Sequence, residues 1–439
     1  MAPTPAPALL LLLAALVAGP VGAAACQPGV YRQGPQAFVV IGPPLPGAGG
    51  AQRTLSLDGR RGTTGSGPSP WACEADLASV TQPDGTVQPW PRDATRQSDV
   101  RFVSAATRLA GRLIEPAGGP DPHRPLVVMV HGSEKTAALD SVYAYMLVAQ
   151  GLSVFVYDKR GTGASDGDYT QNFELLADDA AAALREARRL AAGRFGRAGY
   201  FGASQGGWVA PLAATRSSAD FVAIGFGLVV SPIEEDREQL LDEARQMHLG
   251  PGDTAHVEQL SRATASLLRS HFARGHAELA RVRRAIGAAP WAATIKGEHS
   301  GDMLRMSASD LRRIGRARFD GLGLLWDHDA AAVLRRLKVP LLWVLAADDR
   351  EAPIAATRET LLTLMAAGKP VDAYLFPDTD HGMVEYRTET DGSRTPTRIT
   401  DGYLQLLADW IRRDLRGGYG RALRLQPRGQ QTQARTGPR

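Results

Sequence analysis

The feature that most constrains the fold of this chain is an apolar segment that runs directly into the pattern Gly-x-Ser-x-Gly. Residues 197–201 predict a short strand, Gly202-Ala203-Ser204-Gln205-Gly206 follows, and residues 208–214 form an apolar, helix-like run. A strand, a sharp turn and a helix in this order expose the serine of the turn at the end of a sheet. Glycines flank Ser204 because side chains there would collide where strand and helix meet. The pattern predicts that Ser204 is a nucleophile.

The same pattern occurs a second time, around Ser165, and a chain with 47 glycines can match it by chance. Ser165 follows a turn-rich run, and residues 166–168 (Asp-Gly-Asp) are typical of a loop. No helix-like segment begins directly behind them. We therefore expect Ser165 to be a loop residue.

Strand and helix patterns alternate around Ser204. Apolar runs predict buried strands at residues 126–130, 152–157, 221–230, 341–346 and 371–376. Helices are predicted at 139–150 and 172–192, and a last one is striped with Tyr403, Leu404, Leu407, Ile411 and Leu415. This alternation is typical of an α/β fold with a mostly parallel central sheet and helices on both faces.

Changes in composition divide the chain into six segments. They are a signal peptide (1–25), a β-rich or irregular N-terminal region (26–99), a first core part (100–231), a helical insertion (232–334), a second core part (335–416) and a disordered basic tail (417–439). The insertion is expected to cap the site of Ser204, with a peripheral helical decoration as the alternative. The tail is expected to be a solvated end because its arginines are dispersed, and no nucleic-acid partner is expected.

The N-terminus has the pattern of an export signal. Residues 6–19 are almost wholly apolar, Pro20 breaks the run, and small residues lead to Cys26. Such a run is too short to span a bilayer but fits a signal-peptide core, although no Lys or Arg precedes it. We expect an exported protein, periplasmic or secreted, in which Cys26 and Cys73 form a disulfide. The alternative is a lipidated Cys26, which would anchor the protein to a membrane.

Five short motifs, in order and at the ends of predicted strands, resemble those of the α/β-hydrolase superfamily. They are His131-Gly132, Asp158-Lys159-Arg160-Gly161, the turn at Ser204, Ala347-Asp348-Asp349 with Pro353, and Asp380-His381-Gly382. The resemblance spans residues 100–415 and is greatest to the serine aminopeptidase-like and dienelactone-hydrolase-like branches. It implies an α/β-hydrolase fold and a serine hydrolase that cleaves an ester, thioester or amide bond through an acyl-enzyme.

Such chemistry needs an imidazole that takes the proton of the serine hydroxyl. His381 is the only one of the nine histidines that follows both Ser204 and a predicted core strand. It is therefore the predicted base. Six other histidines lie in the insertion, where surface or structural roles are expected: His248, His256, His271, His276, His299 and His328.

The chemistry also needs a carboxylate that orients the imidazole, and in this superfamily the acid precedes the histidine. The family pattern places the acid four residues before a proline, which favours Asp349 over Asp348 because position 353 is Pro. Asp348 stays open, and Glu234, Glu235 and Asp236 are a minor alternative.

The resemblance also implies an oxyanion hole made by the backbone N–H groups of Gln205 and Ser133. No metal site and no cofactor are expected, since no His/Cys/Asp cluster in the insertion has metal-ligand spacing. The expected partner is a small-molecule or peptide acyl substrate, and the sequence leaves the oligomeric state open. A cofactor-free haloperoxidase, an acyltransferase and a non-catalytic binding protein on the same fold are the alternatives.

Overall fold

The computed structural model describes residues 25–45, 47–64, 71–74, 76–81 and 84–427. Residues 1–24 of the predicted signal peptide and residues 428–439 of the predicted tail lie outside this part. Within it, no helix is both long and apolar enough to cross a membrane.

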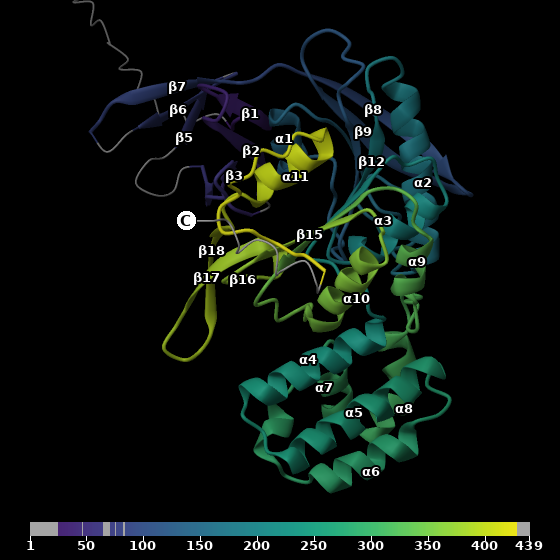
Figure 1. Cartoon of the computed structure of the whole chain (residues 1–439). Coiled ribbons are helices and arrows are strands. Elements are labelled where there is room, and N and C mark those ends of the chain that lie inside the picture. The colour runs from purple at the N-terminus through teal and green to yellow at the C-terminus, as the bar shows by residue number, and fades with distance from the viewer. Residues whose placement is uncertain (1–24, 46, 65–70, 75, 82–83, 428–439) are drawn as a thin grey trace, which may run out of the picture.

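A nine-stranded sheet forms the centre of the molecule (Figure 1), in the order β19-β15-β14-β13-β12-β10-β11-β9-β8. The parallel strands are β10 (Leu126–Val130), β11 (Ser153–Tyr157), β12 (Ala198–Ala203), β13 (Val222–Gly225), β14 (Leu341–Ala346) and β15 (Val371–Phe376). The antiparallel strands are β8 (Thr95–Ser104), β9 (Thr107–Pro116) and β19 (Leu423–Arg424), of which β8 and β19 form the two edges. The predicted, mostly parallel sheet is confirmed, although β13 ends well before residue 230.

Helices cover both faces of this sheet. On one face lie α2 (Phe173–Leu190), α3 (Gly206–Thr215), α9 (Ala330–Arg336) and α10 (Ala355–Ala366). On the other lie α1 (Val142–Ala149) and α11 (Tyr403–Arg412). Alternate side chains of β10 enter the two cores: Leu126 and Val128 the first, Val127 the second. Burial of both faces explains why the central strands are continuous apolar runs.

Helix ends depart slightly from the predicted ranges. Asn172 precedes α2 and caps it by accepting a hydrogen bond from Leu175 N. The last helix stops at Arg412, because Arg413 adopts a left-handed conformation with φ +59°. Leu415, predicted to belong to the apolar stripe, therefore lies past the helix and is 41% exposed.

The N-terminal region is β-rich, as predicted. One antiparallel sheet contains β1 (Gly29–Arg32), β2 (Phe38–Pro44), β3 (Gln52–Ser56) and β4 (Arg61–Thr63), and a second contains β5 (Trp71–Glu74), β6 (Leu77–Thr81) and β7 (Val87–Pro91). A disulfide joins Cys26 to Cys73, with the Cα atoms 5.1 Å apart. Cys26 is buried beside Tyr31 and Ile41, so the bond ties the two small sheets together.

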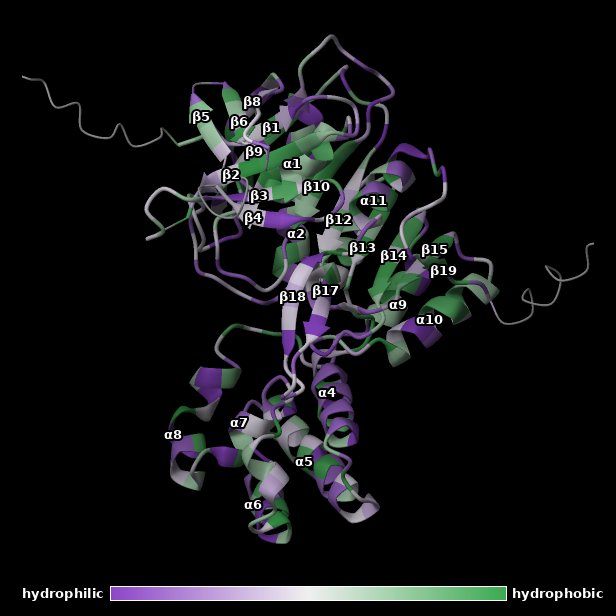
Figure 2. Ribbon diagram, turned by 90° about the vertical axis from the view of Figure 1, so that its left-hand side faces the viewer, coloured by the Kyte–Doolittle hydropathy of each residue, from purple (hydrophilic) through white to green (hydrophobic). Residues whose placement is uncertain are grey.

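The segment between β13 and β14 is helical. It contains α4 (Pro232–Gln246), α5 (Pro251–Arg269), α6 (His276–Ile286), the 3₁₀ helix η1 (Pro290–Ala293), α7 (Ser300–Arg305) and α8 (Ala308–Phe319). These helices stand apart from the sheet in both overall views (Figures 1 and 2) and enclose an apolar core of their own. Trp291 and Trp326 are buried in that core.

A third small sheet follows β15 and was not predicted. It consists of β16 (Thr379–Asp380), β17 (Val384–Thr388) and β18 (Arg394–Ile399), and the 3₁₀ helix η2 (His381–Met383) lies between the first two. The segment predicted as a tail from residue 417 contains β19, which pairs with β15. The ordered chain thus extends beyond the predicted boundary, because this stretch adds an edge strand to the central sheet.

Candidate active site

Ser204 lies in the turn between β12 and α3, with φ +51°. A Cβ on Gly202 would lie 2.5 Å from Gly206 O, and one on Gly206 would lie 2.8 Å from Val130 O. Only glycine therefore allows the strand and the helix to approach so closely. Since β10 pairs with β11 on one side and with β12 on the other, the turn lies where the strand order reverses, the usual place for a binding crevice in such sheets.

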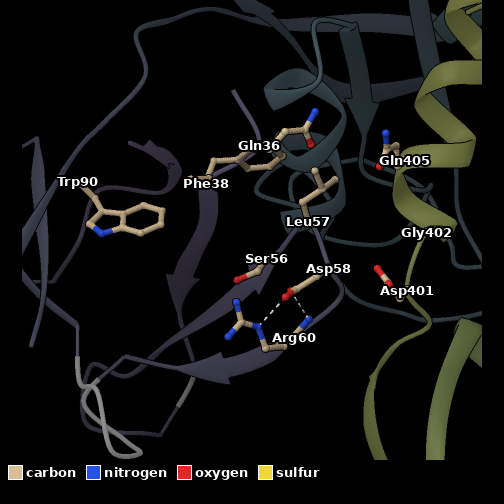
Figure 3. A pocket seen from close by; sticks show the side chains of 11 residues that line it. Gln36, Phe38, Ser56, Leu57, Asp58, Arg60, Trp90, Asp401, Gly402 and Gln405 are labelled. Atoms are coloured by element: carbon tan, nitrogen blue, oxygen red, sulfur yellow. Dashed lines mark hydrogen bonds and ion pairs between the residues drawn. The ribbon is translucent and has the colours of Figure 1, made fainter. Parts of the chain in front are cut away.

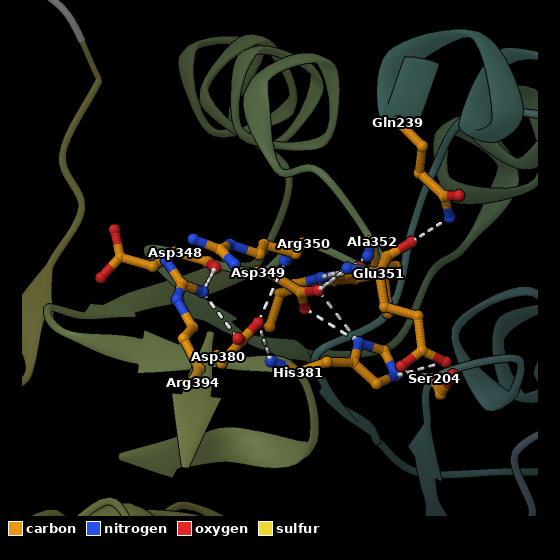
Figure 4. A network of polar contacts seen from close by, with 12 residues as sticks. Ser204, Gln239, Asp348, Asp349, Arg350, Glu351, Ala352, Asp380, His381 and Arg394 are labelled. Atoms are coloured by element: carbon orange, nitrogen blue, oxygen red, sulfur yellow. Dashed lines mark hydrogen bonds and ion pairs between the residues drawn. The ribbon is translucent and has the colours of Figure 1, made fainter. Parts of the chain in front are cut away.

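Two segments far away in the sequence meet this serine (Figure 4). His381, which follows β16, places its Nε2 atom 3.2 Å from Ser204 Oγ. Its Nδ1 atom lies 3.1 and 3.0 Å from the two carboxylate oxygens of Asp349, which follows β14. The structure thus brings together the serine, the histidine and the favoured acid predicted from sequence.

The carboxylate of Asp349 is held in a buried, hydrogen-bonded site. Its side chain is 1% exposed. Besides the imidazole, its Oδ1 atom accepts hydrogen bonds from Glu351 N at 3.1 Å and from Ala352 N at 2.7 Å. These two N–H donors fix the direction of the carboxylate, so Asp349 can orient the imidazole of His381.

The pKa of His381 is raised above its ordinary value. Burial alone would lower this pKa, but the hydrogen bond to Asp349 and the negative charges of Asp349, Glu351 and Asp380 outweigh it. The ring of Phe226 packs edge-on against the imidazole, with the ring centroids 5.0 Å apart. An imidazole in this setting can accept the proton of a serine hydroxyl and hold it as a cation.

The other acids and the second serine considered from sequence lie elsewhere. Asp348 turns away from the imidazole and accepts a hydrogen bond from Tyr386 Oη at 2.9 Å. Asp236 is buried and accepts hydrogen bonds from two backbone N–H groups at the start of α7, at 2.9 and 3.1 Å. Ser165 Oγ donates to Asp158 O at 2.6 Å inside its loop. Of these residues, none contacts His381 or Ser204.

The loop after β10 adjoins the serine from the other side. A Cβ on Gly132 would lie 3.5 Å from Ser204 Cβ. The carbonyl oxygen of Gly132 accepts a hydrogen bond from Lys159 Nζ at 2.7 Å, and burial lowers the pKa of this lysine to about 8. In the described part of the chain, neither Ser133 N nor Gln205 N donates to a protein acceptor. His131 instead hydrogen-bonds to Tyr157 O, and burial lowers its pKa.

Sequence reasoning missed several side chains at the site. Glu351 places an oxygen 3.8 Å from His381 Nε2 and is 64% exposed. Gln239 of α4 donates to Glu351 O and so connects the helical segment to the loop of the acid. Glu235 was not missed, since the sequence offered it as a minor alternative for the acid; burial, with neighbouring carboxylates that include Glu298, raises its pKa well above its ordinary range. For the missed residues, the sequence offered one signal: Glu351 lies two positions after Asp349 and could have been expected near the site.

A pocket of about 420 Å³ lies elsewhere (Figure 3), between the N-terminal sheet and the start of α11. Phe38, Trp90 and Gln405 line it, together with an exposed ion pair in which Arg60 Nε lies 2.8 Å from Asp58. Neither Ser204 nor His381 is among its lining residues, so it is separate from the site.

Residues 121–247 match the family described as serine aminopeptidase, S33. This range contains the turn of Ser204 and the loop of Gly132. The protein has the α/β-hydrolase fold. The exposed serine at the strand end, together with the family match, indicates that this protein is a serine hydrolase. No curated protein sequence matches this hydrolase.

Solved structures similar to the hydrolase are distant. An esterase from Pyrococcus furiosus is 14% identical, with 65% of this chain and 84% of that chain covered and a TM-score of 0.41. An acylaminoacyl peptidase from Pyrococcus horikoshii is 15% identical, with 83% and 54% covered and a TM-score of 0.43. The hydrolase GrgF from Penicillium sp. sh18 is 18% identical, with 65% and 91% covered and a TM-score of 0.38.

Proposed function

We propose that this protein hydrolyses acyl compounds, esters, thioesters or amides, with Ser204 as nucleophile, His381 as general base and Asp349 as the orienting acid. The observation that carries the proposal is the continuous row of contacts from Ser204 Oγ to His381 Nε2 and from His381 Nδ1 to Asp349. This row of contacts lies at the end of β12, where the turn exposes the hydroxyl of Ser204. The geometry is that of the nucleophile, base and orienting acid in serine hydrolases.

In the first half of the reaction, Ser204 Oγ attacks the substrate carbonyl carbon while its proton passes to His381 Nε2. The backbone N–H groups of Gln205 and Ser133 stabilise the negative charge that forms on the carbonyl oxygen. When the tetrahedral intermediate collapses, the bond to the leaving group breaks, and His381 returns the proton to that group. Water, activated by the same imidazole, then attacks the acyl-enzyme. This step releases the carboxylic acid product and regenerates Ser204.

A probe of serine reactivity tests this proposal directly. A fluorophosphonate should label the purified protein once, on Ser204, and labelling should disappear in Ser204→Ala. A panel of p-nitrophenyl esters, acyl thioesters and aminoacyl p-nitroanilides of increasing chain length would then define the acyl group and the leaving group. A protein that resists the probe and turns over no substrate of the panel would contradict the proposal.

We also propose that the protein works outside the cytoplasm. Support comes from the apolar N-terminal segment and from the disulfide between Cys26 and Cys73, a bond that persists in oxidising compartments.

A further inference from the structure

The two loops that carry the base and the acid are tied to each other by few direct contacts. Asp348 N donates to Thr379 O at 2.9 Å, and Arg350 N donates to Asp380 Oδ1 at 3.0 Å. Asp349 lies in the loop after β14, and His381 lies in the loop after β15. Their hydrogen bond therefore depends on whatever holds these loops in register.

A third segment bridges the two loops. Arg394, the first residue of β18, donates from Nη1 to Asp348 O at 2.6 Å and to Asp380 Oδ2 at 2.6 Å. The other oxygen of Asp380 accepts from His381 N at 2.8 Å. One guanidinium nitrogen thus contacts the residue directly before the acid and the residue directly before the base (Figure 4).

The guanidinium group is itself held in place. It stacks on the ring of Tyr386 from the neighbouring strand β17, with Arg394 Cζ 3.8 Å from the ring centroid. The hydroxyl of Tyr386 in turn hydrogen-bonds to the carboxylate of Asp348. The side chain of Arg394 is only 16% exposed. A planar guanidinium can stack on a ring and donate hydrogen bonds in its own plane at the same time, whereas an ammonium group has no planar face to stack.

We propose that Arg394 is a positioning residue that locks the loop of Asp349 onto the loop of His381 and balances the charge of Asp380 beside the base. The inference rests on the proposed function, because it assigns a role in aligning those two catalytic residues. The hairpin β17–β18 is then part of the active-site support.

A purely structural role, such as holding the hairpin, would leave the titration of the base unchanged. The charged groups that act on His381 are Asp349 and Glu351 from one loop and Asp380 from its own. Arg394 lies against Asp380 and offsets its charge. Loss of the guanidinium leaves this carboxylate uncompensated, so the pKa of the base should rise further. Loss of the Asp380 carboxylate should instead lower the pKa of His381.

The experiment compares kcat, KM and the pH profile of kcat/KM in the full-length protein. Arg394→Met should lower kcat by roughly 10- to 100-fold, since small misplacements of catalytic groups cost that much, and should move the acidic limb to higher pH. Arg394→Lys should recover part of kcat and keep the limb near its wild-type position, because it keeps the charge. Asp380→Asn should move the limb to lower pH. Its amide oxygen can still accept from His381 N.

Arg387 provides the matched control. It lies on the same hairpin but is 70% exposed, and among the residues that the structure describes it forms an ion pair with Glu389 alone. Arg387→Met should leave kcat and the pH profile unchanged. Thermal melting of every variant separates a loss of alignment from a loss of fold.

An Arg394→Met protein that melts like wild type and keeps both its kcat and its acidic limb would overturn the inference. If that variant does not fold, Arg394→Lys and Asp380→Asn decide by the same measurements, and an unmoved limb in Asp380→Asn counts against it. Retained turnover in Ser204→Ala would instead overturn the proposed function itself. The two failures are therefore distinguishable.

Discussion

The imidazole of His381 lies 3.2 Å from the hydroxyl of Ser204, although 177 positions separate the two residues in the chain. Each is held by its own constraint. The serine is fixed by a tight turn between strand and helix, and the histidine by a short 3₁₀ segment anchored through Asp380. The contact forms because β12, β14 and β15 lie in one parallel sheet and end at the same edge.

Removal of the nucleophile is the first test of this arrangement. Ser204→Ala should lower kcat by roughly 10⁴- to 10⁶-fold, as loss of a triad member does elsewhere. Ser165→Ala should reduce activity far less and cost about 1 kcal/mol of stability through its lost hydrogen bonds. Steady-state kinetics and chemical denaturation measure both effects. Labelling of Ser165 by a fluorophosphonate, with Ser204 unlabelled, would show that the assignment is wrong.

The pH dependence should report His381. The pKa of His381 is raised above the ordinary imidazole value of about 6.5. The ring therefore stays protonated, and cannot act as a base, until the pH exceeds that raised pKa. kcat/KM should therefore fall as pH decreases through that raised pKa. His381→Gln should abolish this limb together with most of the activity. A variant with an unchanged profile would remove His381 from the mechanism.

Glu351 should tune that same limb. Its carboxylate lies 3.8 Å from His381 Nε2 and is one of the charges that raise the pKa of the imidazole. Glu351→Gln removes this charge, so the acidic limb should move to lower pH. Glu278→Gln, on the exposed surface of α6, is the control and should leave the limb in place. A limb that stays fixed in Glu351→Gln would mean that solvent screens this charge.

The disulfide should be measurable by mass and by stability. Export predicts a mature chain that begins between Ala24 and Cys26, two hydrogens lighter than its reduced form, with a tryptic peptide that joins Cys26 to Cys73. The sequence separation of 47 corresponds to a stabilisation of about 4 kcal/mol in the chain-entropy model, an upper value. Replacing both cysteines by alanine should lower unfolding stability by no more than this. A diacylglyceryl mass on Cys26 would instead identify a lipoprotein.

Much of the framework was already encoded locally. The strands over residues 126–130, 341–346 and 371–376 have the predicted bounds, because buried central strands are continuous apolar runs that local composition reveals. The turn at Ser204 was equally visible, since Gly202 is required by its close approach to Gly206, only four residues away. What the sequence determined by itself was the order of strands and helices and the position of the exposed serine.

The tertiary structure decided how loop side chains are aimed. Asp348 and Asp349 are neighbours of identical chemistry, yet one accepts from Tyr386 and the other meets His381. Arg394 carries no local pattern that marks it, and its contacts exist only once the hairpin β17–β18 has folded beside both loops. Strand and helix patterns are visible locally because the burial of successive residues sets their spacing, whereas the direction of a loop side chain depends on partners that only packing brings within reach.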